Sequence, residues 1–599
     1  MKRLLSGNEA IALGAHHAGV IVAAAYPGTP STEILENLAR FDGVYTEWST
    51  NEKVAMEVGM GAAYGGARAL VSMKHVGLNV AADPFFAASV TGIGGGLVVV
   101  SADDPGMHSS QNEQDNRHYA KFAKVPMLEP ADSQDAYDLM GVAFKISEDF
   151  DTPVLVRSTT RISHCKSVAD IRDDAIPKPR AAGFKREPTK YVMVPSYARA
   201  RHVLIEERIA KLAGYSETFP YNQIIPGDKG LGIVSSGVAY QYVREVFPEA
   251  SFLKLAMSYP LPERLIRRFA RGVKKVVVVE ELDPFLEEAL RVMGITAKGK
   301  KYFPMVGELS IETVEEGAHK AGILPEKAEN KVGILPRLPA RPPRLCPGCP
   351  HTAANFALKR LGRSPGLRKA GLIATADIGC YTLAVFPPLM TLDTTACMGA
   401  SIGQALGLEK AGLQNRVVAV IGDSTFMHSG ITSLVDVVYN QGRTTVIILD
   451  NGTTAMTGHQ GHPGTGISAR GEKTQVVDLE EVCRGVGVKD VNVINAFNVG
   501  LIKSTIRRCL DAKEPSVVIV RGHCVLHHRV SGEALVVDPE KCNGCRTCLQ
   551  LGCSAIIREG KKARIESMLC VGESCGVCAQ VCPQEAISPT ERAKAGGVN

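Results

Sequence analysis

The chain has 599 residues, of which 45% are hydrophobic and 22% are charged, so it is long enough for roughly three to five folded domains with buried cores. The formal net charge of +6 is small and the lysines and arginines are dispersed, which argues against a nucleic-acid-binding protein. No apolar run approaches the length of a membrane span and the N-terminus has no signal-peptide pattern, so we expect a cytoplasmic protein that does not cross a membrane.

Residues 1–190 alternate β-like runs with Gly- and Ala-rich helical stretches. This alternation predicts a mostly parallel sheet covered by helices. We read the first residues as a helix followed by a strand, which runs into the turn Tyr26-Pro-Gly-Thr-Pro-Ser-Thr32. The expected strands are 20–25, 97–101 and 153–157, and the expected helix is 54–69.

A second α/β unit is predicted for residues 191–325. Its charged helix at 198–212 and the polar stretch before it are interpreted as the connector to the first unit. Its expected strands are 232–235 and 275–280, with a helix at 262–271 between them. Residues 326–344 are rich in proline and are interpreted as a linker between domains.

The third unit, residues 345–530, carries polar side chains at the ends of two predicted strands. The strand 417–421 leads into Asp423, and the strand 445–449 leads into Asn451. Because ligands of parallel sheets bind at the carboxyl ends of the strands, both side chains are expected at one point. Asp423, Asn451 and the carbonyl of Thr453 form a set of hard oxygen ligands that suits Mg²⁺ on a diphosphate. The other reading of Gly422-Asp-Ser424 is an ordinary strand-to-helix turn.

Residues 531–599 hold eight of the sixteen cysteines, in two runs with the spacing of a two-cluster ferredoxin. In such domains the fourth cysteine of each run ligates the other cluster, and each four-thiolate cluster carries roughly −2. Zinc ribbons and disulfides are the alternatives, but interleaved sets that end in Cys-Pro are unusual for zinc, and disulfides suit small secreted domains. The first run ends in x4-C and the second opens with C-x4-C, which leaves room for a labile second cluster. The predicted sets are Cys542, Cys545, Cys548 and Cys582 for one [4Fe–4S] cluster, and Cys553, Cys570, Cys575 and Cys578 for the other.

The pair Gly422-Asp-Ser424 and Asn451 has the form of a thiamine diphosphate signature. Together with Cys346-Pro-Gly-Cys349, it resembles the diphosphate-binding domain of the 2-oxoacid:ferredoxin oxidoreductases. The 26–32 loop resembles that family's Tyr-Pro-x-Thr-Pro-Ser loop, which implies that Thr29 contacts the substrate. The resemblance also implies that Glu52 activates the coenzyme's pyrimidine ring. Glu57 is its rival on the same helix, and a carboxylate favoured at a helix start is the structural alternative.

The resemblance extends to a third possible set of cluster ligands. Cys346, Cys349, Cys380 and Cys524 are similar to the family's cluster nearest to thiamine. The alternative is that Cys380 and Cys524 are small buried residues, as free cysteines usually are. The remaining cysteines have no partner spacing and are interpreted as packing residues; they are Cys165, Cys397, Cys483 and Cys509.

The whole chain resembles the large subunits of this family that act on aryl pyruvates. The implied fold class is α/β, with two doubly wound thiamine-diphosphate-binding modules, a transketolase-C-terminal-like domain and a two-cluster ferredoxin domain. The implied reaction is oxidative decarboxylation of aryl pyruvates such as indolepyruvate, with coenzyme A taking the acyl group and ferredoxin the electrons. The family's gamma-type domain has no counterpart in these 599 residues, so a small beta subunit is expected to supply it in an αβ or (αβ)2 assembly.

The chain departs from the family pattern at the positions that contact the substrate. Where pyruvate-type relatives place an asparagine at the reacting carbonyl, this chain has Met456, which favours an aromatic substituent. The family's carboxylate-binding arginine has no evident counterpart, and Lys74, His75 and His459 are candidate polar groups. Three alternatives stay open: a pyruvate- or 2-oxoglutarate-type enzyme, a thiamine carboligase without redox chemistry, and an electron-transfer subunit without catalysis.

Overall fold

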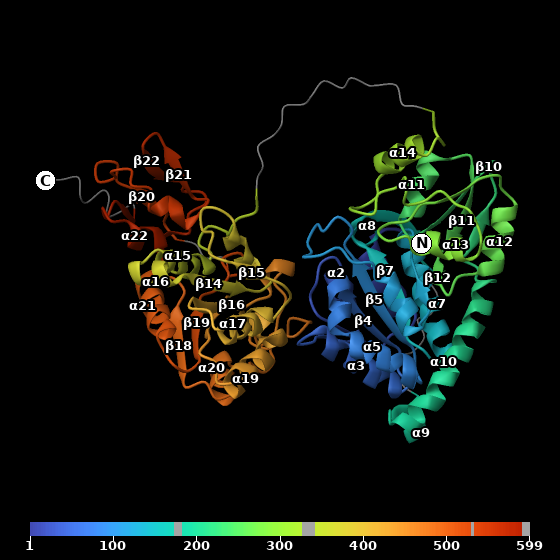
Figure 1. Cartoon of the computed structure of the whole chain (residues 1–599), viewed down its shortest axis with the longest axis horizontal. Helices are drawn as coiled ribbons and strands as arrows, with labels where there is room; N and C mark the ends of the chain where they lie inside the picture. Colours follow the sequence, from blue (N-terminus) through green and yellow to red (C-terminus); the bar gives the residue numbers. More distant parts are fainter. Residues whose placement is uncertain (173–181, 326–341, 529–531, 590–599) are drawn as a thin grey trace. The chain divides into compact units, whose positions relative to one another are not determined.

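A computed structural model describes residues 1–172, 182–325, 342–528 and 532–589. The chain divides into two compact units, Met1–Ile334 and Leu335–Asn599 (Figure 1). The first unit contains the segments predicted as domains 1–190 and 191–325, and the second contains 345–530 and 531–599. The domain boundaries themselves stay a prediction, and most of the predicted linker, 326–341, lies outside the described residues.

The main sheet of the first unit has the strand order β12-β6-β7-β5-β4-β2-β3. Its strands pair in parallel except for β12 with β6. β5 (Leu97–Asp103) is buried at every position, so both faces of the sheet are covered, as expected for a parallel sheet. The other strands are β2 (Val22–Ala25), β3 (Tyr45–Trp48), β4 (Ala69–Lys74), β6 (Met127–Leu128), β7 (Val154–Thr159) and β12 (Met257–Tyr259). The helices are α1 (Gly7–His17), α2 (Thr32–Leu38), α3 (Glu52–Tyr64), α4 (His75–Val80), α5 (Ala82–Thr91), α6 (Arg117–Ala123), α7 (Ser133–Phe150) and α8 (Thr160–His164).

The predicted N-terminal helix and strand correspond to α1 and β2. A strand that was not predicted, β1 (Lys2–Ser6), precedes them and pairs antiparallel with β8 (Lys166–Asp170). The predicted helix 54–69 ends at Tyr64, because Gly65 caps it and Gly66 has a φ of 79°, a left-handed conformation that glycine adopts without strain. β4 therefore begins at Ala69.

A second sheet in this unit, β13-β10-β11-β9, lies within residues 191–325. A buried ion pair connects the two parts of the unit: Arg117 Nη1 lies 2.6 Å from Glu280, while Arg117 Nη2 lies 2.6 Å from Asp115 of its own part. A buried ion pair is stable only when its charged atoms also have hydrogen-bond partners, so this requirement fixes how the two segments pack. The elements here are α9 (Pro188–Tyr191), α10 (Pro195–Ser216), β9 (Gln223–Ile225), β10 (Asp228–Ser236), α11 (Ala239–Val246), β11 (Ala250–Leu255), α12 (Glu263–Arg271), β13 (Val276–Val278), α13 (Phe285–Val292) and α14 (Ile311–Lys320).

The second unit is built on a parallel sheet of order β15-β14-β16-β17-β19-β18. Alternate residues of its central strands enter two separate cores, one with α17 and α19 and the other with α15 and α21, so this sheet also has both faces covered. The strands are β14 (Leu372–Ala376), β15 (Thr394–Thr395), β16 (Arg416–Gly422), β17 (Thr445–Asp450), β18 (Asp490–Asn495) and β19 (Ser516–Arg521). The helices are α15 (His351–Gly362), α16 (Pro365–Ala370), α17 (Ala400–Lys410), α18 (Asp423–Thr425), α19 (Ile431–Tyr439), α20 (Leu479–Gly485) and α21 (Val499–Leu510).

The cysteine-rich tail belongs to the second unit and packs against the core formed by α15 and α21. Leu535, Leu551 and Val577 of the tail belong to the same buried cluster as Phe356 and Ile502. The tail consists of two small antiparallel sheets and a short helix: β20 (Leu535–Val537) with β23 (Ile587–Pro589), β21 (Ile556–Glu559) with β22 (Lys562–Ile565), and α22 (Val577–Val581). Within the four described segments of the chain, none of the helices has both the length and the apolar character needed to span a membrane.

Candidate active site

Asp423 and Asn451 meet at the carboxyl edge of the second unit's sheet. β16 and β17 are adjacent and parallel, with Gly422 opposite Leu449, so the residues after them come together. The backbone N–H groups of Asn451 and Gly452 donate to Asp423 Oδ2 over 3.1 and 2.8 Å. The structure thus places the two predicted side chains at one point.

The hydrogen bonds of Asp423 divide unevenly between its two oxygens. Oδ2 accepts the two backbone amides and Oδ1 accepts the N–H of Ser424, at 2.8 Å, while the Asp450 carboxyl group interacts with the same side chain. Burial raises the pKa of Asp423, but the contact with His462 and the backbone hydrogen bonds outweigh burial and hold the pKa below its usual range. A buried, ionised carboxylate beside an amide oxygen and a carbonyl fits Mg²⁺.

The predicted cofactor-binding glycine has a steric reason to be glycine. A Cβ at Gly422 would lie 2.8 Å from the ring of Tyr381, too close for any other residue. Next to it, Ser424 accepts a hydrogen bond from the Thr454 hydroxyl over 2.9 Å, and the Thr453 N–H donates to Asn451 Oδ1 over 3.2 Å. These contacts join the turn after β16 to the loop after β17.

His462 is a buried residue of this loop that the sequence did not single out. Its Nδ1 accepts the N–H of Gly464 over 3.2 Å, so the proton of a neutral ring is on Nε2. Nε2 lies 3.3 Å from Asp423 Oδ2 and has no better-aligned partner among the described residues. The ring therefore faces the oxygen of Asp423 that is already held by the backbone.

In the first unit, the structure separates Glu52 from its rival Glu57. Glu52 is the first residue of α3 and is only 5% exposed, while Glu57 is exposed and forms an ion pair with Lys53. A Cβ at Gly77 would lie 2.8 Å from Glu52 Oε1, so the absence of a side chain at Gly77 makes room for this carboxyl group. Of the two candidates, only Glu52 is held in a fixed, buried position.

Thr29 and Lys74 lie around one short segment of the first unit. The Ser109 hydroxyl donates to the Thr29 carbonyl over 3.3 Å, and Lys74 Nζ donates to the Ser109 carbonyl over 3.0 Å. Burial lowers the pKa of Lys74 to about 8, although Asp104 and Glu52 act in the opposite direction. The neighbouring His75 is fully buried, with Nε2 3.0 Å from Asn112 Oδ1. No sequence motif had pointed to the segment around Ser109.

The structure brings together each of the three predicted cysteine sets. Burial, together with the nearby Cys524 and Cys346 thiols, raises the pKa of Cys380 to about 11. Burial and the other three thiols likewise raise the pKa of Cys349. Burial also raises the pKa of Cys548, with Cys582, Cys545 and Cys542 adding to the rise. Burial raises the pKa of Cys578 to about 12, with Cys575, Cys553 and Cys570 as its neighbours. The two tail sets line two separate small cavities, grouped as the crossing rule predicts.

The remaining cysteines divide into two kinds. Cys483 and Cys509 are fully buried in the two cores of the second unit, as expected of packing residues. Cys165 and Cys397 are exposed, so the packing interpretation is wrong for these two.

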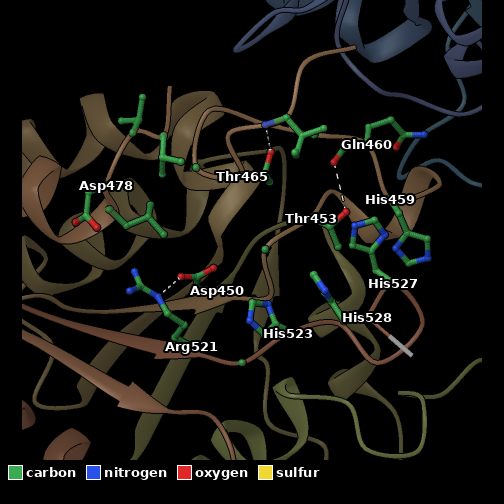
Figure 2. Close-up of a pocket in the computed structure, with 18 residues that line it drawn as sticks. Asp450, Thr453, His459, Gln460, Thr465, Asp478, Arg521, His523, His527 and His528 are labelled. Atoms are coloured by element: carbon green, nitrogen blue, oxygen red, sulfur yellow. Dashed lines mark hydrogen bonds and ion pairs between the residues drawn. The ribbon is translucent and has the colours of Figure 1, made fainter. Parts of the chain in front are cut away.

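A cavity of about 440 Å³ opens at the carboxyl ends of β17 and β19 (Figure 2). Asp450 and Arg521, opposite each other in the strand register, form an ion pair of 2.6 Å there. Gly452 and Thr453, in the loop after β17, also line it. Its histidines are His459, His523, His527 and His528, of which only His459 was a candidate from the sequence.

Comparisons with known proteins identify a thiamine-diphosphate-binding domain in each of the two units. Residues 377–520 match the thiamine pyrophosphate enzyme C-terminal TPP-binding domain, and residues 13–210 match the thiamine-diphosphate-binding domain of pyruvate flavodoxin/ferredoxin oxidoreductases. The chain is 43% identical to indolepyruvate oxidoreductase subunit IorA of Archaeoglobus fulgidus, over 98% of both chains. It is 42% identical to the IorA of Methanothermobacter marburgensis, over 98% of this chain and 97% of the relative. A solved 2-oxoglutarate:ferredoxin oxidoreductase from Magnetococcus marinus aligns with a TM-score of 0.44 and 17% identity, over 53% of this chain and 65% of that one.

Proposed function

The chain belongs to the indolepyruvate oxidoreductase subunit IorA family, thiamine-diphosphate-dependent 2-oxoacid:ferredoxin oxidoreductases, and from this we propose how its residues act on an aryl pyruvate. The reaction is oxidative decarboxylation of indolepyruvate with coenzyme A, which yields the aryl-acetyl-CoA, CO2 and reduced ferredoxin. The observation that carries the proposal is that one unit holds both the Asp423 site and grouped cysteines, with the backbone of Cys524 hydrogen-bonded to that of Asn451.

Both modules contribute residues for the coenzyme. Asp423, Asn451 and the Thr453 carbonyl would hold Mg²⁺ on the diphosphate, and Gly422 and Ser424 line the same turn. Glu52 would hydrogen-bond the pyrimidine ring, and its burial keeps water from competing for that contact. Thr29 would contact the substrate. When bound, thiamine diphosphate supplies a nucleophilic carbon and an electron sink for decarboxylation.

The route for electrons follows contacts within the second unit. The N–H of Cys524 donates to the carbonyl of Asn451 over 3.1 Å, so the set of Cys346, Cys349, Cys380 and Cys524 begins at the metal-binding loop. A backbone hydrogen bond from Gly348 reaches Cys553, which belongs to the next set. We assign a [4Fe–4S] cluster to each set, with the tail forming a ferredoxin domain. Electrons would leave one at a time through these clusters to ferredoxin.

A partner subunit completes the enzyme in this proposal. The relatives are named as subunits, and we expect a small beta subunit with the gamma-type domain to join this chain in an αβ or (αβ)2 assembly.

The test is an anaerobic assay of the complex with its partner subunit. We expect coenzyme-A-dependent reduction of benzyl viologen with indolepyruvate and other aryl pyruvates, and much slower reduction with pyruvate or 2-oxoglutarate. A preference for pyruvate or 2-oxoglutarate would replace the substrate assignment. No reduction with any 2-oxoacid, by a complex that can still be reduced with dithionite, would leave electron transfer as the function.

A further inference from the structure

The cavity at the ends of β17 and β19 has two walls of opposite chemistry (Figure 2). One wall carries imidazole rings from two loops: His459 stacks on His527 with ring centroids 5.4 Å apart, and His528 lies 4.8 Å from His527. The other wall is mostly apolar: beside Asp478 it carries Ile467, Val476 and Val477, which are 42%, 56% and 38% exposed. Exposed apolar side chains that gather beside polar groups in a cavity are typical of a ligand site.

The histidine wall offers hydrogen bonds that the protein does not use. Nδ1 of His459 has no hydrogen-bond partner in the part of the chain that the structure describes, but it is itself buried. The exposed ring of His527, which stacks on His459, is therefore the one that a ligand in the cavity meets. Arg521 is paired with Asp450 over 2.6 Å, whereas the ring of His527 can offer an N–H group to a carboxylate.

The cavity adjoins the loop that carries the proposed Mg²⁺ ligands. Gly452 and Thr453 line it, next to Asn451, whereas none of its lining residues comes from β14 or β16. A molecule bound here would therefore touch Thr453, one of the proposed Mg²⁺ ligands, and lie beside Asn451, another. In open parallel sheets this edge is where substrates bind.

We propose that this cavity binds the aryl 2-oxoacid, with its aromatic ring against Ile467, Val476 and Val477 and its carboxylate toward His527. The volume of about 440 Å³ lies within the roughly 300–1,000 Å³ of small-molecule sites. A 2-oxoacid with a methyl group in place of the ring would leave these apolar side chains in contact with water, so the wall favours aryl substrates. The inference rests on the proposed function and adds to it the residues that select the substrate.

The experiment measures binding of indole-3-acetate, an unreactive aryl carboxylate, to the complex with its partner subunit by calorimetry. Val476→Glu places a charge on the apolar wall, Val476→Thr changes its polarity at constant shape, and His527→Ala removes a donor. Val435→Glu is the matched control, because Val435 on α19 is 46% exposed and lies outside the cavity. Val476 is no less exposed than Val435, so its substitution is compatible with folding.

We expect V476E and H527A to weaken indole-3-acetate binding by about tenfold or more, V476T to weaken it less, and V435E to bind like the wild type. The ratio of kcat/KM for indolepyruvate to kcat/KM for pyruvate should fall in parallel. Wild-type affinity in both V476E and H527A would overturn the assignment, as would displacement of indole-3-acetate by coenzyme A. If the wild type uses aryl pyruvates but the variants bind normally, only the cavity assignment fails; if the wild type uses none, the proposed function fails first.

Discussion

Replacing Glu52 by glutamine tests the assignment of the activating carboxyl group. Glutamine has the shape of glutamate, so the buried side chain can keep its place beside Gly77, where a Cβ would lie only 2.8 Å from Oε1. What is lost is the ability to exchange a proton with the pyrimidine ring. General acid–base groups of this kind contribute about 10²–10⁴-fold, or roughly 3–5 kcal/mol in the activation barrier.

The control is Glu57→Gln on the same helix. Glu57 is exposed and paired only with Lys53, so its loss should leave the rate and the stability nearly unchanged. Two assays separate chemistry from folding: viologen reduction with indolepyruvate, and hydrogen–deuterium exchange at the thiazolium carbon measured by NMR. Both rates should fall by at least about 10² in E52Q. Exchange at the wild-type rate in E52Q, or an equal loss in E57Q, would refute the assignment.

Two further predictions concern buried groups. Burial raises the pKa of Glu281 from 4.5 to about 7, although Arg157 acts in the opposite direction. The folded state therefore binds the proton of Glu281 more tightly than the unfolded state does, and the free energy of unfolding falls as the pH rises from 4.5 to 7. Glu281→Gln should remove this loss of stability, which amounts to up to about 3 kcal/mol. Chemical denaturation should then show the variant to be more stable than the wild type above pH 7 but not at pH 4. An unchanged pH dependence of stability in the variant would contradict this role of Glu281. His462→Phe keeps a ring beside Asp423 but removes its N–H, so Mg²⁺ affinity measured by calorimetry in the presence of thiamine diphosphate should fall about 10–100-fold, and equal affinity would show that His462 does not orient the carboxylate.

Sequence spacing predicted the features that depend on short stretches of chain. Asp423 and Asn451 could be placed together because each follows a strongly apolar strand, and the strands proved to be neighbours in the sheet. The two tail sets of cysteines could be divided from spacing alone, and Cys548 and Cys578 each lie with the three partners predicted for them.

Features that depend on distant segments could not be predicted in this way. Glu52 was preferred over Glu57 only through the family resemblance, because the physical difference between them is which face of α3 is buried. β12 joins the main sheet of the first unit by pairing with β6, more than a hundred residues earlier, which no local pattern indicates. The cavity with His527 likewise exists only because the loops after β17 and β19 meet.

The proposed function connects carbon chemistry at thiamine diphosphate to iron–sulfur clusters within one polypeptide. The direct measurement is the visible absorption of the anaerobically purified complex, mixed with indolepyruvate and coenzyme A in a stopped-flow instrument without added ferredoxin. We predict a brown protein whose cluster absorption bleaches on mixing, and no bleaching in Asp423→Ala. A colourless complex, or cluster absorption that indolepyruvate leaves unchanged while dithionite bleaches it, would contradict the claim.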